Sequence, residues 1–312
     1  MLLSVSRRTD IPAFFSDWFF TRIAEGFVLV RNPMNHRQVA CISLSPEVID
    51  GIVFWTKNPA PMLGRLNALR AYPYYFHVTV TPYGQDIEQG LPGKESDIIP
   101  ALQKLSGMTS PERVIWRYDP VLLNAKYTVD FHINAFERMA SLLEGYVEKC
   151  VFGFVDDYKN VRRHAADLGI RPMPDDVKNM LAGAFADSAW RHGITLCTCC
   201  EELDGSPYGI ESSACIDAAL FERIAGYKLA TKKDPNQRPE CQCAVSIDIG
   251  LYNTCSNGCL YCYANYNEKL VAGQMQRHDS TSPLLVGHVE AEDKVYDRCI
   301  ASCIDKQASF LD

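Results

Sequence analysis

The sequence predicts an α/β protein folded as a single (β/α)8 barrel of the TIM type, and three observations support this prediction. Eight short runs rich in β-branched and aromatic residues recur along the chain, each is nearly all apolar, and helical patterns separate most of them. Short apolar strands that alternate with helices are typical of a parallel sheet covered by helices. Eight such units over about 250 residues match a closed barrel better than an open sheet.

The expected strands and helices follow one another from the N-terminus to residue 250. The strands are LLSVS at 2–6, FVLV at 27–30, IVFW at 52–55, YYFHVTV at 74–80, RVIW at 113–116, CVFGFV at 150–155, ITLC at 194–197 and VSIDIG at 245–250. The helices span 14–23, 60–69, 98–105, 129–143, 175–190 and 214–224. The unit after FVLV is irregular, because QVACISLSPEVID reads partly as an additional strand.

Polar residues follow almost every strand run and point to an active site. They are SRRTD, RNP, TKNP, TPY, RYDP, DDY and CTCCEE, in chain order. In a (β/α)8 barrel such strand ends converge on the C-terminal face, where the active site forms. We expect residues 1–285 to form the barrel, with a Cys-rich insertion at 197–243 and a C-terminal Cys-rich extension. Residues 286–312 are expected to form a tail helix.

The composition limits the classes of protein to which this chain can belong. The chain of 312 residues is 47% hydrophobic, which is enough for a substantial core. The net charge of −7 creates no global basic field that would attract nucleic acid. The N-terminus lacks the features of a signal peptide, and no apolar run approaches the roughly 20 residues of a membrane-spanning helix. A cytoplasmic protein with no membrane partner is expected.

The cysteines are clustered in the last third of the chain. Of the thirteen cysteines, Cys41 and Cys150 lie in strand-like runs, and the other eleven lie between Cys197 and Cys303. A reducing compartment does not keep disulfides formed, so clustered thiols there indicate metal ligands or redox groups. Cys41 and Cys150 are expected to be core residues.

Cys255, Cys259 and Cys262 form the most specific motif, with spacings of three and two residues. Such a short loop can wrap one cubane, and Gly258 supplies the tight turn that the loop needs. Iron–sulfur clusters normally take four cysteines, so three thiolates leave one iron open to another ligand. The alternative is zinc, whose structural sites prefer paired knuckles that close to four ligands.

The C-x3-C-x-Y-C pattern after a strand resembles the signature of the radical SAM superfamily. SVSRRTDIP, FWTKNP, RYDPV and QRPECQCAVSIDIGLYNTCSNGCLYCYAN resemble a bacterial and archaeal family of unassigned function. The TKNP and RYDP strand ends are similar to those of the spore photoproduct lyase-like branch of that superfamily. The resemblance covers about residues 1 to 285.

The resemblance implies a [4Fe–4S] cluster on Cys255, Cys259 and Cys262, with S-adenosylmethionine on the open iron and Tyr261 near its adenine. The motif usually follows the first strand of the barrel, whereas here it follows the last. The last strand lies beside the first in a closed barrel, so a circularly permuted barrel is expected.

The order of strands around such a barrel also implies that the residues at the end of the first strand contact S-adenosylmethionine. Asp10 is a candidate partner for its ammonium, and Arg7 or Arg8 for its carboxylate. The alternative for Asp10 is a cap on the helix that opens at Pro12.

Three further strand-end residues are candidates for chemistry in the barrel mouth. Lys57 and Arg117 are expected to bind a carboxylate, either of S-adenosylmethionine or of the substrate. Arg117 and Asp119 alternatively form an ion pair that closes the rim.

A second set of cysteines is expected to bind a second metal centre. Cys199, Cys215, Cys241 and Cys243 are the expected ligands, for either a second [4Fe–4S] cluster or zinc. A strand of about eight residues spans roughly 25 Å, so Cys243 and Cys255 would lie at opposite ends of the barrel unless that strand starts late.

These observations predict an oxygen-sensitive radical SAM enzyme. It would cleave S-adenosylmethionine reductively to a 5′-deoxyadenosyl radical that acts on an unknown substrate, with a reductant such as flavodoxin or ferredoxin. The acidic balance argues against a large nucleic acid, but the lyase-like branch includes DNA repair and keeps nucleic acid among the candidates. The alternatives are a non-enzymatic iron–sulfur electron carrier or scaffold, and a zinc-stabilised barrel.

Overall fold

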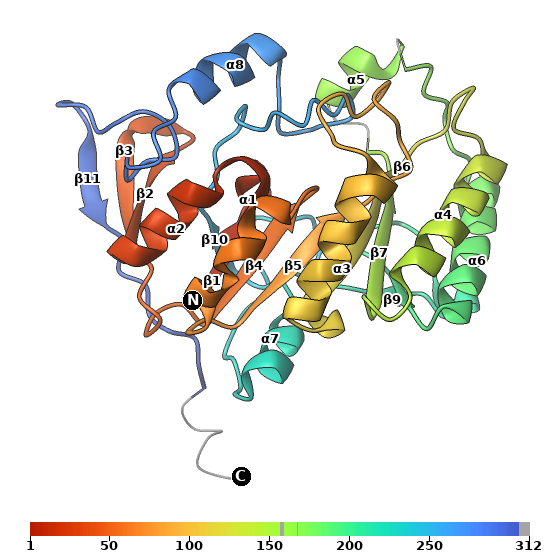
Figure 1. Ribbon diagram of the computed structural model, residues 1–312, viewed down its shortest axis with the longest axis horizontal. Helices are drawn as coiled ribbons and strands as arrows, with labels where there is room; N and C mark the ends of the chain where they lie inside the picture. Colours follow the sequence, from red (N-terminus) through yellow and green to blue (C-terminus); the bar gives the residue numbers. More distant parts are fainter. Residues whose placement is uncertain (157–158, 167, 306–312) are drawn as a thin grey trace.

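The computed structural model describes residues 1–156, 159–166 and 168–305, and its centre is an eight-stranded parallel sheet (Figure 1). The strands are β1 (Leu2–Val5), β4 (Gly51–Thr56), β5 (Tyr74–Thr79), β6 (Val114–Val121), β7 (Lys149–Phe154), β8 (Thr195–Thr198), β9 (Glu211–Ser212) and β10 (Ser246–Asp248). Their order is β10-β1-β4-β5-β6-β7-β8-β9, and every neighbouring pair is parallel.

The predicted closed barrel is wrong, because the sheet is open. Strands β9 and β10 lie at its two edges and do not pair with each other. The last strand does lie beside the first, since Ile247 pairs with Leu3. The strand order of this open sheet does not test the expected circular permutation.

The sheet does not close on itself, and a chain segment covers one of its faces. We call residues 199–244 the covering segment; it contains helix α7 (Ala218–Ala225). Its residues Ile216 and Phe221 are buried in one apolar cluster with Val53 and Ile115 of the strands. In a barrel the inward side chains fill the interior by themselves. Here the covering segment occupies that space, and the sheet stays open.

The run FVLV belongs to a second sheet and not to the main one. It forms β2 (Phe27–Asn32), which pairs antiparallel with β3 (Asn35–Ser43), and β11 (Lys294–Asp297) pairs parallel with β3. The additional strand predicted after FVLV is therefore confirmed. Residues 286–305 contain β11 and no helix, so the expected tail helix is absent from that range; residues 306–312 lie outside the described residues.

Five of the α-helices in the described residues lie close to predicted positions, and the three at 11–14, 159–165 and 268–276 were not among the predicted helix ranges. The α-helices are α1 (Ile11–Phe14), α2 (Ser16–Glu25), α3 (Ile99–Met108), α4 (Val129–Leu143), α5 (Lys159–Ala165), α6 (Asp175–Arg191) and α8 (Glu268–Gln276), besides α7. The predicted helix at 60–69 is a 3-10 helix, Ala60–Leu69; Pro111–Arg113 and Ser206–Tyr208 are short 3-10 turns, and Lys94–Ile98 is a π-helical turn. Helices α3, α4 and α6 lie along one side of the sheet (Figure 1). Within the described part of the chain, no helix is long and apolar enough to cross a bilayer.

The contact between β4 and α7 gives a test of this architecture. A Cβ atom on Gly51 would lie 2.3 Å from Cε1 of the buried Phe221 ring. We expect Gly51→Ala to lower the free energy of unfolding by about 1–3 kcal/mol, because the ring must move in a packed core. Urea denaturation measures this change.

Gly273→Ala is the matched control, because nothing lies within 4 Å of a Cβ at Gly273 in α8. This variant should be as stable as wild type or up to about 1 kcal/mol more stable, since alanine favours a helix over glycine. A Gly51→Ala protein of unchanged stability would contradict the packing of α7 on the sheet.

Candidate functional site

The carboxyl ends of the strands surround a cavity of about 940 Å³. Residues at or just beyond the carboxyl ends of β1, β4, β6, β7, β8 and β10 line it, so these strand ends meet in space, whereas the predicted TPY end after β5 is not part of the lining. Asp156 of the expected DDY end lies on its wall, whereas Asp157 and Tyr158 lie outside the described residues.

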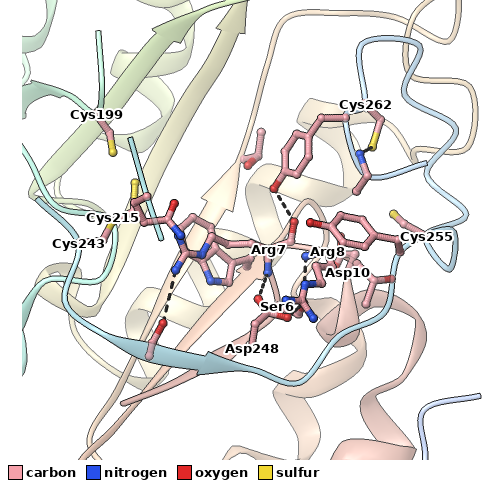
Figure 2. A pocket seen from close by; sticks show the side chains of 18 of the residues that line it. Ser6, Arg7, Arg8, Asp10, Cys199, Cys215, Cys243, Asp248, Cys255 and Cys262 are labelled. Atoms are coloured by element: carbon pink, nitrogen blue, oxygen red, sulfur yellow. Dashed lines mark hydrogen bonds between the residues drawn. The ribbon is translucent and has the colours of Figure 1, made fainter. Parts of the chain in front are cut away.

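Two sets of cysteines line this cavity from opposite sides (Figure 2). The first set is Cys255, Cys259 and Cys262; the second set is Cys199, Cys200, Cys215, Cys241 and Cys243. The long strand assumed between them does not exist, because β10 has only three residues, Ser246–Asp248. The sets therefore face one cavity, and the sequence estimate of their separation was wrong.

The loop that carries the first set is held from two sides. The side chain of Asn257 donates a hydrogen bond to Asp10 Oδ2 at 3.0 Å. From the other side, Gly90 N donates to Asn257 O at 2.9 Å, and Leu260 N donates to Ile87 O at 3.0 Å. The loop after β5 and the end of β1 thus fix the cysteine loop against the sheet.

Two glycines make this arrangement possible. Gly258 has a φ of +62°, a conformation that favours glycine. A Cβ on Gly90 would lie 2.4 Å from Ser256 O, so only glycine lets the two loops approach each other there.

Asp10 is the N-cap of α1. Its contacts therefore support the helix-capping role that the sequence offered as the alternative to ligand binding. Its Oδ1 accepts from Ala13 N at 3.0 Å, and its Oδ2 accepts from Lys57 N at 2.8 Å as well as from Asn257. Burial raises the pKa of Asp10 above its ordinary value. Both oxygens of Asp10 are thus engaged by groups of the protein, and Asp10 also lines the cavity.

The first set suits a group larger than a single ion. Among the described residues, the groups whose ligand atoms lie within 4.8 Å of one another belong to the second set, and Cys255, Cys259 and Cys262 do not form such a group. Burial raises the pKa of all three thiols, that of Cys259 to about 12. Ala264 N donates to Cys262 Sγ at 3.3 Å. Three partly buried thiols on one cavity-lining loop are a suitable donor set for a cluster.

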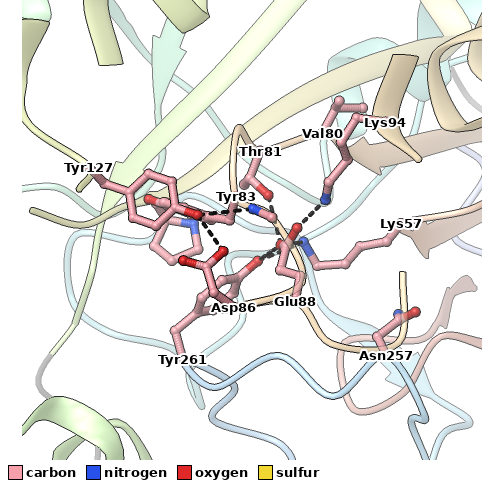
Figure 3. A network of polar contacts seen from close by, with 12 residues as sticks. Lys57, Val80, Thr81, Tyr83, Asp86, Glu88, Lys94, Tyr127, Asn257 and Tyr261 are labelled. Carbon is pink, nitrogen blue, oxygen red and sulfur yellow. Dashed lines mark hydrogen bonds and ion pairs between the residues drawn. The ribbon is translucent and has the colours of Figure 1, made fainter. Parts of the chain in front are cut away.

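Behind this loop, Glu88 is the centre of a buried polar network (Figure 3). Lys57 Nζ lies 2.7 Å from Glu88 Oε1, and Thr81 Oγ1 donates to the same oxygen at 2.7 Å. Lys94 forms an ion pair with Oε2, and the Tyr261 hydroxyl donates to Oε1. Although burial opposes ionisation, the two lysines lower the pKa of Glu88 to about 2.

Lys57 and Tyr261 both contact Glu88 in this network, which their predicted roles did not include. Burial by itself lowers the pKa of Lys57, but the charges of Glu88 and Cys259 outweigh it and raise that pKa. Lys57 Nζ also donates to Tyr261 Oη at 2.7 Å. Lys57 therefore neutralises Glu88 beside the first set, and is less available to a substrate carboxylate than the sequence suggested.

Arg7 and Arg8 both line the cavity, but their side chains diverge (Figure 2). The Arg7 guanidinium lies 5.8 Å from the centre of the Trp55 ring and 3.4 Å from Ser246 Oγ. The Arg8 guanidinium lies 5.4 Å from the centre of the Tyr252 ring and 3.4 Å from Gly250 O. Arg8 thus faces the loop of the first set, and Arg7 faces the middle of the cavity.

The second set is compact enough to hold a metal ion. Cys199, Cys215 and Cys243 have sulfur atoms within 4.8 Å of one another, and Cys199 forms a second such group with Cys200 and Cys241. All four predicted ligands therefore come together, with Cys200 added. Hydrogen bonds with Cys199 and Cys215 hold the pKa of Cys243 well below its ordinary value of 9.0.

Arg117 and Asp119 belong to the second set. Arg117 Nη1 donates to Cys215 Sγ at 3.0 Å, and Nη2 forms an ion pair with Asp119. The ion pair named as the alternative from sequence is therefore present, and it places a guanidinium against the thiols. A cation in that position stabilises thiolate, which is the form that binds metal.

Several residues of the site carry no motif in the sequence. Glu88 and Lys94 lie in the loop after β5 among ordinary polar residues, and only the burial of Glu88 and its ion pair with Lys94 identify them. Glu201 directly follows the second set and lines the cavity; Phe154 N donates to its Oε1 at 3.0 Å, and burial raises its pKa to about 7. Its position next to a cysteine pair was the available signal.

Comparison with known proteins gives one match. Residues 2–264 match the model of a family described as domain of unknown function DUF1848. No curated protein and no solved structure matches the chain.

The Glu88 network gives a prediction with a defined pH dependence. Glu88→Gln should lower the free energy of unfolding by about 3–5 kcal/mol at pH 7, because it leaves two buried lysines without their carboxylate. The pKa of Glu88 falls from 4.5 to about 2 on folding, so its contribution is complete above pH 4.5 and is lost as the pH falls toward 2.

The stability difference between wild type and Glu88→Gln should therefore shrink between pH 5 and pH 3, measured by denaturation at each pH. Glu95→Gln is the matched control, because its partner Arg138 is largely exposed and the pair should matter little. A constant difference across this pH range would contradict an ionised Glu88.

Proposed function

We propose that this chain, which belongs to the DUF1848 family, is a radical SAM-type iron–sulfur enzyme that acts on a small substrate in the cavity. The observation that carries the proposal is the position of the C-x3-C-x-Y-C loop. It holds Cys255, Cys259 and Cys262 at a cavity formed by the carboxyl ends of parallel strands. Such a location is where open α/β sheets bind ligands.

The residues present fit a [4Fe–4S] cluster with one open coordination position. When bound there with S-adenosylmethionine, the cluster would supply the electron that yields a 5′-deoxyadenosyl radical. The chain contributes three thiolates, and the buried Lys57–Glu88–Lys94 group carries one net positive charge beside Cys259. A net positive charge near the thiolates offsets part of the negative charge of a thiolate-ligated cluster.

The chain also supplies groups that would orient S-adenosylmethionine. Arg8 lies on the side of the first set and is the candidate for its carboxylate. Tyr261 directly precedes Cys262, and its hydroxyl is fixed by Glu88, so its ring is held rigidly at the cavity wall. A rigid wall excludes water from a reactive intermediate.

For the second set we propose a metal centre as well, with two candidate occupants. One is a second [4Fe–4S] cluster that relays electrons or anchors the substrate. The other is zinc: thiolates about 2.3 Å from a tetrahedral zinc ion stand about 3.8 Å apart. In both groups that contain Cys199 the sulfur atoms lie within 4.8 Å of one another, and this spacing favours a single zinc ion.

Anaerobic reconstitution tests the reaction. The purified protein should contain iron and sulfide, and with dithionite and S-adenosylmethionine it should release 5′-deoxyadenosine, detected by liquid chromatography. Cys259→Ala should abolish this product, because a cluster with two protein thiolates is not held. Cys150→Ala is the control: Cys150 is buried in β7, and its variant should retain the activity.

Two outcomes would overturn the proposal. Iron and sulfide without any 5′-deoxyadenosine would favour an electron carrier. A preparation with zinc and no iron would favour the zinc-stabilised alternative.

Metal analysis of variants separates the two centres. We expect Cys243→Ala to remove the metal of the second set and to leave the cluster of the first, whereas Cys259→Ala should do the reverse. Zinc and iron are measured per chain by mass spectrometry, with Cys41→Ala as the control. Loss of all metal from both variants would show instead that the two sets share one centre.

A further inference from the structure

Arg7 presents a cation to the middle of the cavity without a carboxylate partner among the described residues. A guanidinium has five N–H donors. The side-chain hydrogen bond that the structure gives Arg7 is the long one to Ser246 Oγ, at 3.4 Å. The rest of its contact is with the face of Trp55, at 5.8 Å from the ring centre. Most of its donors are therefore open to a ligand.

Asp248, on the strand beside β1, accepts its hydrogen bonds from uncharged donors. Asp248 Oδ1 accepts from Ser6 Oγ at 2.6 Å and from Gly250 N at 2.9 Å. Its Oδ2 accepts from Ser4 Oγ at 2.9 Å and from the backbone N of Arg7 at 2.8 Å. Each oxygen thus has two partners, and the Arg7 guanidinium is not one of them.

Most other cations that line the cavity have a carboxylate partner; among the described residues, the exposed Arg298 after β11 has none. Lys57 is paired with Glu88, and Arg117 with Asp119. Arg31 at the rim is paired with Asp293, with 2.6 Å between Nη1 and Oδ1. Arg8 lacks a carboxylate partner too, but it faces the first set. Apart from Arg298, Arg7 alone of these described cations is unpaired and faces away from the first set.

We propose that Arg7 binds an anionic group of the substrate, a carboxylate or a phosphate, against Trp55 and between the two cysteine sets. This deepens the proposed function and rests on it: it names the substrate class, a small organic anion. Guanidinium groups bind both anions through paired N–H donors. A cavity of about 940 Å³ is at the upper end for small-molecule sites and has room for a substrate beside a cofactor.

The fluorescence of Trp55 can report anion binding at Arg7 without any catalytic reaction. The Trp55 ring stacks on His77 on one side, with ring centres 4.5 Å apart, and lines the cavity with Arg7. An anion that binds Arg7 changes the charge against this indole. Binding is therefore measured by tryptophan fluorescence and by calorimetry, on the metal-loaded full chain at constant ionic strength.

The probes are inorganic phosphate and malonate, which distinguish the two anion types. We expect at least one of them to bind wild type. Arg7→Gln should weaken that binding about tenfold or more, because it removes charge-assisted hydrogen bonds. Arg7→Lys should restore part of it. Arg37→Gln, which changes an exposed arginine outside the cavity, should stay within about twofold of wild type.

S-adenosylmethionine binding separates this proposal from the function on which it rests. Arg7→Gln should still bind S-adenosylmethionine and still release 5′-deoxyadenosine in the absence of substrate. Loss of both anion and S-adenosylmethionine binding in Arg7→Gln would make Arg7 a cofactor contact and overturn the proposal. It is overturned equally if wild type binds neither probe, or if Arg7→Gln binds them as tightly. Absence of 5′-deoxyadenosine in every variant, with Arg7-dependent anion binding intact, would instead refute the radical reaction alone.

Discussion

The carboxylate of Asp248 is the constraint on which the geometry of the cavity depends. It ends the edge strand β10 and accepts hydrogen bonds from Ser4 and Ser6 of the neighbouring β1 segment and from two backbone N–H groups. These four bonds fix the chain at Arg7 and at Gly250 together. They therefore set the opposite directions of the Arg7 and Arg8 side chains, and they orient the chain that leads to Cys255.

Glu88, a buried carboxylate, fixes the loop of the first set through a second network. A buried acid is strongly unfavourable unless its charge is compensated. Lys57 and Lys94 compensate it, and Thr81 and Tyr261 complete its hydrogen bonds. Because these residues come from three separate segments, their network joins β4, the loop after β5 and the cysteine loop. The loop of the first set is thus held by Glu88 and its neighbours on one side and by Asp10 on the other.

The covering segment explains why two distant cysteine sets serve one cavity. By packing Ile216 and Phe221 against the sheet, it places the second set opposite the first. A closed barrel would leave no space for this segment. The open sheet is therefore a condition for the site, and polar groups such as Arg7 and Trp55 line the cavity between the two cysteine sets.

The sequence by itself determined the elements and the chemistry of single positions. Period and apolar runs predicted the strands, including the irregular one after FVLV, because strand formation depends on local residue pattern. The spacing of Cys255, Cys259 and Cys262 likewise indicates ligation through local loop geometry. Only the tertiary structure decided that the sheet stays open, since closure depends on whether a segment such as the one around Phe221 fills its inner face. It also decided that Lys57 pairs with Glu88 while Arg7 stays unpaired, because the partners of a charge are set by contacts between residues far apart in the chain.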